Sequence, residues 1–167
     1  MGVSGCGKSS LGRAVADAIS QPLIEGDDFH SAANKAKMAS GTPLNDADRQ
    51  AWLAALGEQL REHAQSAVLT CSALKFNYRQ QLREASPGLR FAFLDITPSE
   101  ALVRVAARAG EHLFPASLVD SQFAALESPS DENGVLTLDA TQPLNQLTER
   151  ITNWLSVHST QQQVAAP

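Results

Sequence analysis

Apolar residues recur along most of the chain at the spacing of amphipathic helices, with one such residue every three or four positions. In residues 8–20, Leu11, Val15 and Ile19 fall on one helical stripe. The same periodicity predicts further helices at residues 46–65, 75–85, 97–109, 116–127 and 143–158, and a short helix within 30–41.

Short apolar runs separate these helices and are typical of β-strands. They lie at residues 22–25, 67–71, 90–96 and 135–139. Strands that alternate with helices predict an α/β fold, in which a parallel sheet carries helices on both faces. Since no repeat or linker interrupts the pattern, residues 1–158 are expected to form a single domain. Residues 159–167 have nothing to bury and are expected to form a disordered tail.

Two of the predicted helices begin with capping signals. Asn45 can cap the helix that starts near residue 46. Thr97 and Glu100 form a capping box, with Pro98 at the first helical position.

Composition narrows the class of protein. The 167 residues carry a formal net charge of −5, which argues against a general nucleic-acid-binding face but allows an anionic ligand in a locally positive pocket. Two cysteines are too few for a disulfide framework and their surroundings do not resemble a metal site, so a reducing compartment is expected. The chain shows no apolar run of membrane-span length and no secretory signal, so we expect a cytoplasmic protein.

Candidate chemistry is concentrated near the N-terminus. Residues 2–9 (GVSGCGKS) match the phosphate-loop pattern G-x-x-x-x-G-K-[ST] at every fixed position. The glycines let backbone N–H groups point at phosphate oxygens, and the helix that follows adds the positive end of its dipole. Lys8 can reach the β- and γ-phosphates of a nucleotide, and the Ser9 hydroxyl can ligate Mg²⁺. The predicted nucleotide-binding residues here are Gly2, Ser4, Gly5, Cys6, Gly7, Lys8, Ser9 and Ser10.

The sequence context of this loop is unusual. A phosphate loop normally follows a buried strand, but only Met1 precedes Gly2, so that first strand is missing from this chain. In a parallel sheet the missing strand would be central. We therefore expect a gap between its neighbours, and lower stability than in a chain with several apolar residues ahead of Met1.

Further sequence blocks resemble the gluconate kinase (gluconokinase) family, small relatives of shikimate and nucleoside-monophosphate kinases. The resemblance runs from Met1 to about Trp154. Its blocks are residues 25–30 (EGDDFH), Asn34, 37–49 (KMASGTPLNDADR), 52–53 (WL), 71–75 (CSALK), 78–79 (YR), 121–123 (SQF), 126–127 (LE) and Pro129. The chain departs from the family at Cys6, where Ser is usual, and at Ser31, where Pro is frequent.

The resemblance implies a P-loop kinase fold of the nucleoside-monophosphate and shikimate kinase type. It also implies a small lid near residues 109–116, where 110–115 (GEHLFP) is a variant of the family's lid segment. A homodimer is a further family expectation.

Three residues become candidates for the sugar-acid substrate. Asp27 follows a predicted strand, at the edge where open α/β sheets bind ligands, and could orient the attacking hydroxyl or accept its proton, although a turn aspartate would look the same. His30 could bond a polyol hydroxyl or serve structure alone. Arg49 lies in the first turn of a helix, which a cation does not favour, so a substrate carboxylate or a salt bridge with Asp46 or Asp48 would explain it.

A second group of candidates is basic or amide-bearing. Lys75 and Arg79 are four residues apart on one helical face and could clamp the substrate or a phosphate, or form a solvated basic face. Gln122 could contact nucleotide, substrate or solvent. Arg104 and Arg108 end a helix before the lid, where related kinases place arginines over the transferring phosphoryl group, although a helix C-terminus also favours arginine.

The activity implied is ATP- and Mg²⁺-dependent phosphorylation of D-gluconate to 6-phospho-D-gluconate, with Lys8, Asp27 and Arg108 as catalytic residues. A kinase for shikimate or a nucleoside monophosphate remains an alternative, as does a nucleotide-binding module without turnover. A GTPase switch is disfavoured, because residues 34–37 (NKAK) have Lys where the guanine motif needs Asp.

Overall fold

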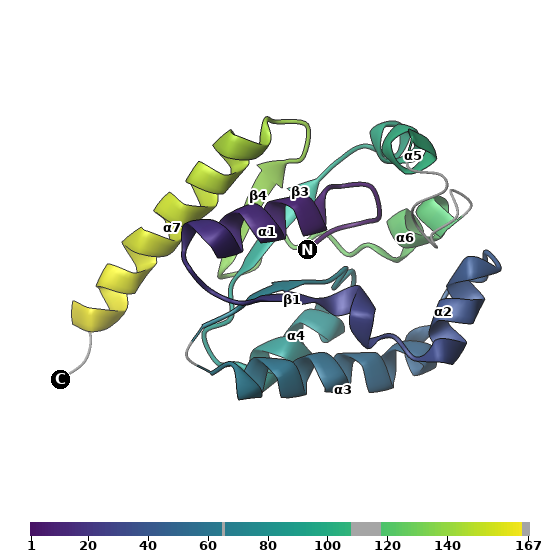
Figure 1. Cartoon of the computed structure of the whole chain (residues 1–167), viewed down its shortest axis with the longest axis horizontal. Helices are drawn as coiled ribbons and strands as arrows, with labels where there is room; N and C mark the ends of the chain where they lie inside the picture. The colour runs from purple at the N-terminus through teal and green to yellow at the C-terminus, as the bar shows by residue number, and fades with distance from the viewer. Residues whose placement is uncertain (65, 108–117, 165–167) are drawn as a thin grey trace.

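The computed structural model describes residues 1–64, 66–107 and 118–164. Within these ranges helices and strands alternate as the hydrophobic pattern predicts (Figure 1). Helices α1 (Lys8–Ala18) and α7 (Leu144–Val164) pack together on one face of the strands, and α3 (Asp46–Glu62) and α4 (Phe76–Ala85) pack together on the other. The α/β architecture with helices on both faces is confirmed.

The strands form two parallel pairs. Strand β1 (Leu23–Glu25) pairs with β2 (Val68–Thr70), and β3 (Phe91–Asp95) pairs with β4 (Val135–Asp139). These pairs are two separate two-stranded sheets, and the division lies at the gap that the sequence analysis expects.

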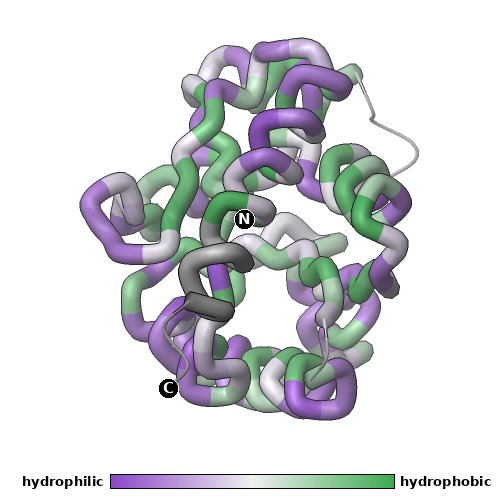
Figure 2. Tube along the Cα trace, turned by 90° about the vertical axis from the view of Figure 1, so that its left-hand side faces the viewer, coloured by the Kyte–Doolittle hydropathy of each residue, from purple (hydrophilic) through white to green (hydrophobic). Residues whose placement is uncertain are grey.

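Met1 and Gly2 lie in the gap between β2 and β3. The Met1 amino group donates to the Ala92 carbonyl at 2.6 Å, and the Leu94 amide donates to the Met1 carbonyl at 3.0 Å. On the other side, the Gly2 amide donates to the Ser72 carbonyl at 3.2 Å. Both views place the N-terminus in the middle of the molecule (Figures 1 and 2). The gap expected beside the phosphate loop is therefore present, and Met1 alone forms a ladder with β3.

A cavity of about 430 Å³ continues along this gap. Leu69 and Cys71 line one side of it, Phe91 and Ala92 line the other, and Val15 of α1 lies over it. Burial lowers the pKa of the Met1 amino group, because the ammonium form loses its hydration there.

The remaining elements follow the predicted order. They are the 3₁₀ helix η1 (Gly26–Phe29) and the α-helices α2 (Ala32–Ala39), α5 (Pro98–Ala107) and α6 (Val119–Ala125). Asn45 caps α3 through a capping box with Asp48, and the Thr97–Glu100 capping box begins α5. Helix α7 continues past the predicted end at residue 158, because no glycine or proline interrupts residues 159–164. The predicted lid, residues 109–116, lies outside the described residues.

The buried apolar side chains form two clusters. One surrounds α1 and includes Leu11, Val15, Leu94 and Leu138. The other lies between α3 and α4 and includes Trp52, Leu56, Tyr78 and Leu82. The first cluster supports the phosphate loop, and the second supports the elements on the opposite side of the split sheet. No helix in the described part of the chain has the length and apolar character needed to cross a bilayer.

Candidate active site

The phosphate loop curls around the start of α1. Gly7 is the N-cap of α1 in a left-handed conformation (φ 98°), and no side chain caps the helix, so its first N–H groups are free for a ligand. Gly5 is also left-handed (φ 81°), and a Cβ there would lie 2.7 Å from the Ala101 carbonyl oxygen. Glycine is therefore needed at Gly5 for both backbone conformation and space. Cys6 is 2 % exposed, so it supports the loop from the protein side, although its backbone N–H remains a candidate.

Lys8 and Ser9, the two side chains predicted to act on phosphate and metal, come directly after Gly7 in the sequence. The Lys8 ammonium donates to the Val3 carbonyl at 2.9 Å, across the base of the loop. The exposed Ser9 hydroxyl donates to the Glu25 carboxylate at 3.1 Å. The Thr70 hydroxyl donates to the same Glu25 oxygen and fixes the carboxylate at the ends of β1 and β2. Sequence reasoning missed Glu25, since only the fold brings it beside Ser9.

Ser9 and Glu25 together fit a magnesium ion. Mg²⁺ prefers oxygen ligands and is held in kinases by one or two protein groups together with substrate phosphates, not by a cage of side chains. A hydroxyl and a carboxylate beside a phosphate loop supply that donor set. The described residues contain no group of three or more His, Cys, Asp or Glu side chains that could hold a metal ion by themselves.

Asp27 lies just beyond β1, in η1. Its side chain is 81 % exposed, and one oxygen lies 4.0 Å from His30 Nε2. Gly26 makes this placement feasible, because any Cβ there would collide with the Thr70 carbonyl oxygen. The Gly26 carbonyl accepts a 2.7 Å hydrogen bond from the Trp52 indole, which pins η1 to α3. The Asp27 carboxylate is thus held at a strand end and remains open to a ligand.

His30 is buried behind Asp27. Its ring stacks on Trp52 with centroids 4.6 Å apart, and its Nδ1 has no hydrogen-bond partner in the described part of the chain. Burial lowers the pKa of His30, an effect only partly offset by the Asp27 carboxylate. The neutral ring therefore supports Asp27 and Trp52, and its direct contact with substrate stays a prediction.

Arg49 lacks the salt bridge that sequence reasoning left open. Asp46 pairs with Lys75 at 2.6 Å, and Asp48 pairs with Lys37 at 2.6 Å. Among the described residues no carboxylate lies within ion-pair distance of Arg49, whose guanidinium lies 6.0 Å from the Tyr78 ring centroid. Burial lowers the pKa of Arg49, opposed by Tyr78 and by the Asp46, Asp27 and Asp48 carboxylates nearby. A half-buried cation of this kind is a site for an anion.

Arg49 opens into a pocket of about 520 Å³. Lys75 and Tyr78 of α4 form one wall, where the Tyr78 hydroxyl and the Lys75 ammonium both donate to Asp46. These two hydrogen bonds, that of Lys75 first, lower the pKa of Asp46. The pocket combines two cations with a carboxylate and a phenol, which suits a small molecule with both a carboxylate and hydroxyl groups.

Gln122 forms part of the opposite wall of this pocket. Its side-chain oxygen accepts a 2.6 Å hydrogen bond from the Ser4 amide of the phosphate loop. The pocket therefore adjoins the loop, and of the alternatives for Gln122, exposure to solvent is excluded because the residue is 9 % exposed.

Arg79 does not belong to the pocket surface. Its side chain is fully buried, and all five guanidinium N–H groups donate to protein acceptors. The prediction that Arg79 contacts substrate is therefore corrected. The spacing predicted that Lys75 and Arg79 share one helical face. Instead, Lys75 precedes the first turn of α4 and points to Asp46, whereas Arg79 points into the core.

The lid arginines are only partly described. Arg104 of α5 donates to the Ala140 carbonyl at 2.9 Å, which joins α5 to the segment after β4. Its contact with nucleotide stays a prediction. Arg108 lies outside the described residues.

A phosphate loop at the N-terminus of the first helix, beside parallel strands and an acidic residue at a strand end, defines a P-loop kinase. The chain matches the shikimate kinase family over residues 4–128. The fold agrees, since a shikimate kinase from Bacteroides thetaiotaomicron superposes with a TM-score of 0.64 over 93 % of this chain and 96 % of that chain, at 17 % identity.

Relatives with higher sequence identity show which family of P-loop kinases the chain belongs to. The chain is 45 % identical to a gluconokinase of Gluconobacter oxydans over 139 residues, which is 81 % of this chain and 78 % of that protein. It is 41 % identical to a thermosensitive gluconokinase of Escherichia coli over 154 residues, 90 % of this chain and 82 % of that protein. A gluconokinase crystal structure from Sinorhizobium meliloti superposes with a TM-score of 0.81 at 43 % identity, over 95 % of this chain and 94 % of that chain. The chain belongs to the gluconokinase family of P-loop kinases.

Proposed function

We propose that this protein transfers the γ-phosphoryl group of ATP to the 6-hydroxyl of D-gluconate and releases 6-phospho-D-gluconate and ADP. The observation that carries the proposal is Arg49, a half-buried cation with no carboxylate partner in the described residues, in a pocket that adjoins the phosphate loop. The carboxylate of gluconate would supply the missing anion, and relatives named as gluconokinases support this choice of substrate.

The proposed role of each residue follows from its position in the site. Loop amides and Lys8 would bind the β- and γ-phosphates, and Ser9 and Glu25 would hold Mg²⁺, which would supply neutralisation of the phosphate charge. Arg49 and Lys75 bind and orient the sugar acid, and Asp27 orients the attacking hydroxyl or accepts its proton. Because phosphoryl transfer depends mainly on positioning and charge neutralisation, these residues, with Arg108 as predicted from the sequence, would supply what the chemistry needs.

A coupled ADP-release assay tests the proposal. We expect ADP release from MgATP that depends on D-gluconate, with 6-phosphogluconate as product. ADP release that is unaffected by gluconate would refute it, and nucleotide binding without release would favour a module without turnover.

Shikimate is the second candidate substrate. The family match over residues 4–128 favours it, and shikimate also carries a carboxylate that Arg49 would accept. A panel of gluconate, shikimate and nucleoside monophosphates at equal concentration distinguishes the alternatives, and we expect gluconate to give the highest kcat/KM.

We also propose a cytoplasmic location, because both cysteines, Cys6 and Cys71, are free and buried. Burial raises the pKa of the Cys71 thiol to about 11, so it stays protonated and unreactive. The homodimer implied by the family is tested by sedimentation of the purified protein.

A further inference from the structure

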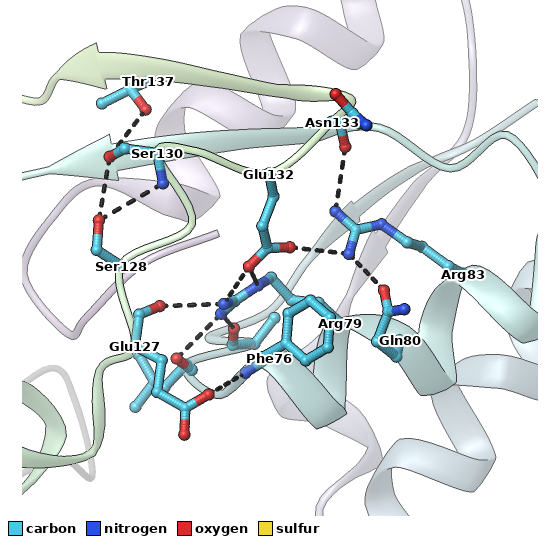
Figure 3. A network of polar contacts seen from close by, with 12 residues as sticks. Phe76, Arg79, Gln80, Arg83, Glu127, Ser128, Ser130, Glu132, Asn133 and Thr137 are labelled. Carbon is cyan, nitrogen blue, oxygen red and sulfur yellow. Dashed lines mark hydrogen bonds and ion pairs between the residues drawn. The ribbon is translucent and has the colours of Figure 1, made fainter.

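A buried ion pair lies behind the wall of the substrate pocket. Arg79 of α4 is 0 % exposed, and Glu132 is its partner (Figure 3). Arg79 Nε donates to Glu132 at 2.9 Å, and Nη2 donates to the same oxygen. The other Glu132 oxygen accepts a 2.8 Å bond from Arg83. Burial opposes ionisation of Glu132, but hydrogen bonds from the two arginines outweigh it and lower its pKa.

The remaining Arg79 donors bind backbone. Nη1 donates to the carbonyls of Ala73 and Leu74 at 2.8 and 3.0 Å, and Nη2 donates to the Glu127 carbonyl at 3.1 Å. One guanidinium therefore ties together the loop after β2, the start of α4 and the segment that follows α6. A lysine has three donors on one atom and cannot reproduce this planar pattern.

Two further contacts connect the same three segments, and together with the hydrogen bonds of Arg79 they form the joint between these segments. The Glu127 amide donates to the Leu74 carbonyl at 2.9 Å, and the Glu127 carboxylate accepts from the Phe76 amide at 2.6 Å, at the N-terminus of α4. Ala73, which directly precedes Leu74, is buried and left-handed at φ 43°, a conformation that costs free energy for alanine. Arg79 holds the carbonyl of this strained residue, so the loop keeps its shape only while the joint is intact.

The joined segments carry opposite walls of the pocket. Lys75 and Tyr78 follow the strained loop directly, while Gln122 lies on α6, ahead of Glu127 in the segment that follows the helix, and binds the phosphate loop. The separation of the walls is thus set where Arg79 and Glu132 meet.

We propose that Arg79 and Glu132 are positioning residues, which fix the wall bearing Lys75 against the wall bearing Gln122 and so set the affinity for the sugar acid. The identity of that ligand rests on the proposed function, whereas the joint itself does not.

The test compares Arg79→Lys with Arg83→Lys. Both arginines lie on α4 and bind Glu132, but Arg83 donates otherwise to Gln80 and Asn133, neither of which lines the pocket or belongs to the loop after β2 or the segment after α6. For Arg79→Lys we expect KM for gluconate to rise about tenfold while KM for ATP stays within about twofold, because misplaced walls act on one substrate only. Amide hydrogen exchange in residues 72–76 and 119–127 should quicken. Arg83→Lys should change neither quantity by more than about twofold.

Several results would overturn the proposal. They are an equal rise of both KM values, an effect of Arg83→Lys as large as that of Arg79→Lys, and unchanged exchange in the two segments. If Arg79→Lys does not fold, Glu132→Gln replaces it, since glutamine keeps the acceptor oxygen and removes the charge, and the same split between KM values is expected. If the wild-type protein ignores gluconate, the proposed function fails, while the exchange experiment still tests the joint.

Discussion

The Gln122 side chain accepts a 2.6 Å hydrogen bond from the Ser4 amide, although the two residues are 118 positions apart. Gln122 lines the pocket that contains Arg49, and Ser4 lies in the phosphate loop. This bond connects the two binding sites that a kinase must bring together.

Removal of the Lys8 ammonium should abolish transfer. We expect Lys8→Ala to lower kcat by about 10³-fold or more, since this charge lies where the transferring phosphoryl group must be stabilised. The coupled assay measures it, with Lys35→Ala as a control that removes a lysine outside the loop. ATP-dependent phosphorylation that persists undiminished in Lys8→Ala would show that the site assignment is wrong.

Arg49 should determine recognition of the carboxylate. We expect Arg49→Gln to lower kcat/KM for gluconate about tenfold to a hundredfold, the loss of one charge-assisted hydrogen bond of about 1.5–3 kcal/mol. Arg61→Gln, on the same helix α3 but exposed, is the matched control. The kcat/KM for a neutral polyol of similar size should fall little in the Arg49 variant. An equal fall in kcat/KM for gluconate and for the polyol would contradict the assignment.

Stability should depend on pH through His30. Burial places the pKa of His30 in the folded state below its ordinary value of 6.5, so the unfolded chain binds the proton more readily. The stability that the neutral His30 ring contributes is present above about pH 6.5, and it is lost as the pH falls toward the lower pKa of His30 in the folded state. Urea unfolding between about pH 7 and pH 5 should show a flatter dependence for His30→Gln than for the wild type. His63→Gln serves as the control and should retain the wild-type slope.

The end of α1 offers a stabilising change. Ser20 is exposed and left-handed at φ 53°, and the Ser20 and Gln21 amides close the helix by donating to Asp17 and Ala16. Glycine is favoured at this position, so Ser20→Gly should raise the free energy of unfolding by about 0.5–1 kcal/mol. Ser20→Ala should not stabilise the protein. A lower unfolding midpoint for the glycine variant than for the alanine variant would contradict the argument.

The gap between β2 and β3 leads to a further prediction about stability. Several apolar residues added ahead of Met1 should fill the 430 Å³ cavity and replace a buried ammonium with an amide. We expect the free energy of unfolding to rise by at least about 2 kcal/mol, the value of one buried apolar side chain. An extension of glycine and serine of equal length is the control. Equal melting temperatures for the apolar extension and the original chain would refute this expectation.

The elements were predictable because each has a local signature. Residues 135–139 were predicted as a strand and match β4 at both ends, and Asn45 and Thr97 begin helices as their capping patterns indicate. The 3₁₀ helix at Gly26–Phe29 was not predicted, because it depends on the close approach of Gly26 to Thr70. The sheet is divided where Met1 and Gly2 lie between β2 and β3, and a gap at this place was expected from the sequence.

The site was predictable where a motif fixes chemistry, and less so where burial decides it. Lys8 and Ser9 begin α1, as the phosphate-loop pattern predicts, and Asp27 lies just beyond β1, as its place after a predicted strand indicates, while their roles stay predictions. Glu25 was missed, because its role depends on the hydroxyls of Ser9 and Thr70, and Arg79 was misassigned, because helical spacing does not show which arginine enters the core. The partner of Arg79, Glu132, carries no local signal at all.

The two apolar clusters have a consequence for how the protein denatures. In the described part of the chain, Met1 and Gly2 supply the backbone bonds between the β1–β2 sheet and the β3–β4 sheet, whereas each apolar cluster contains side chains from strands of both sheets. Cooperativity across a domain depends on contacts that link its parts. Heating should therefore melt both sheets together, because neither can lose its packing without the other, and a calorimetric trace would record a single peak.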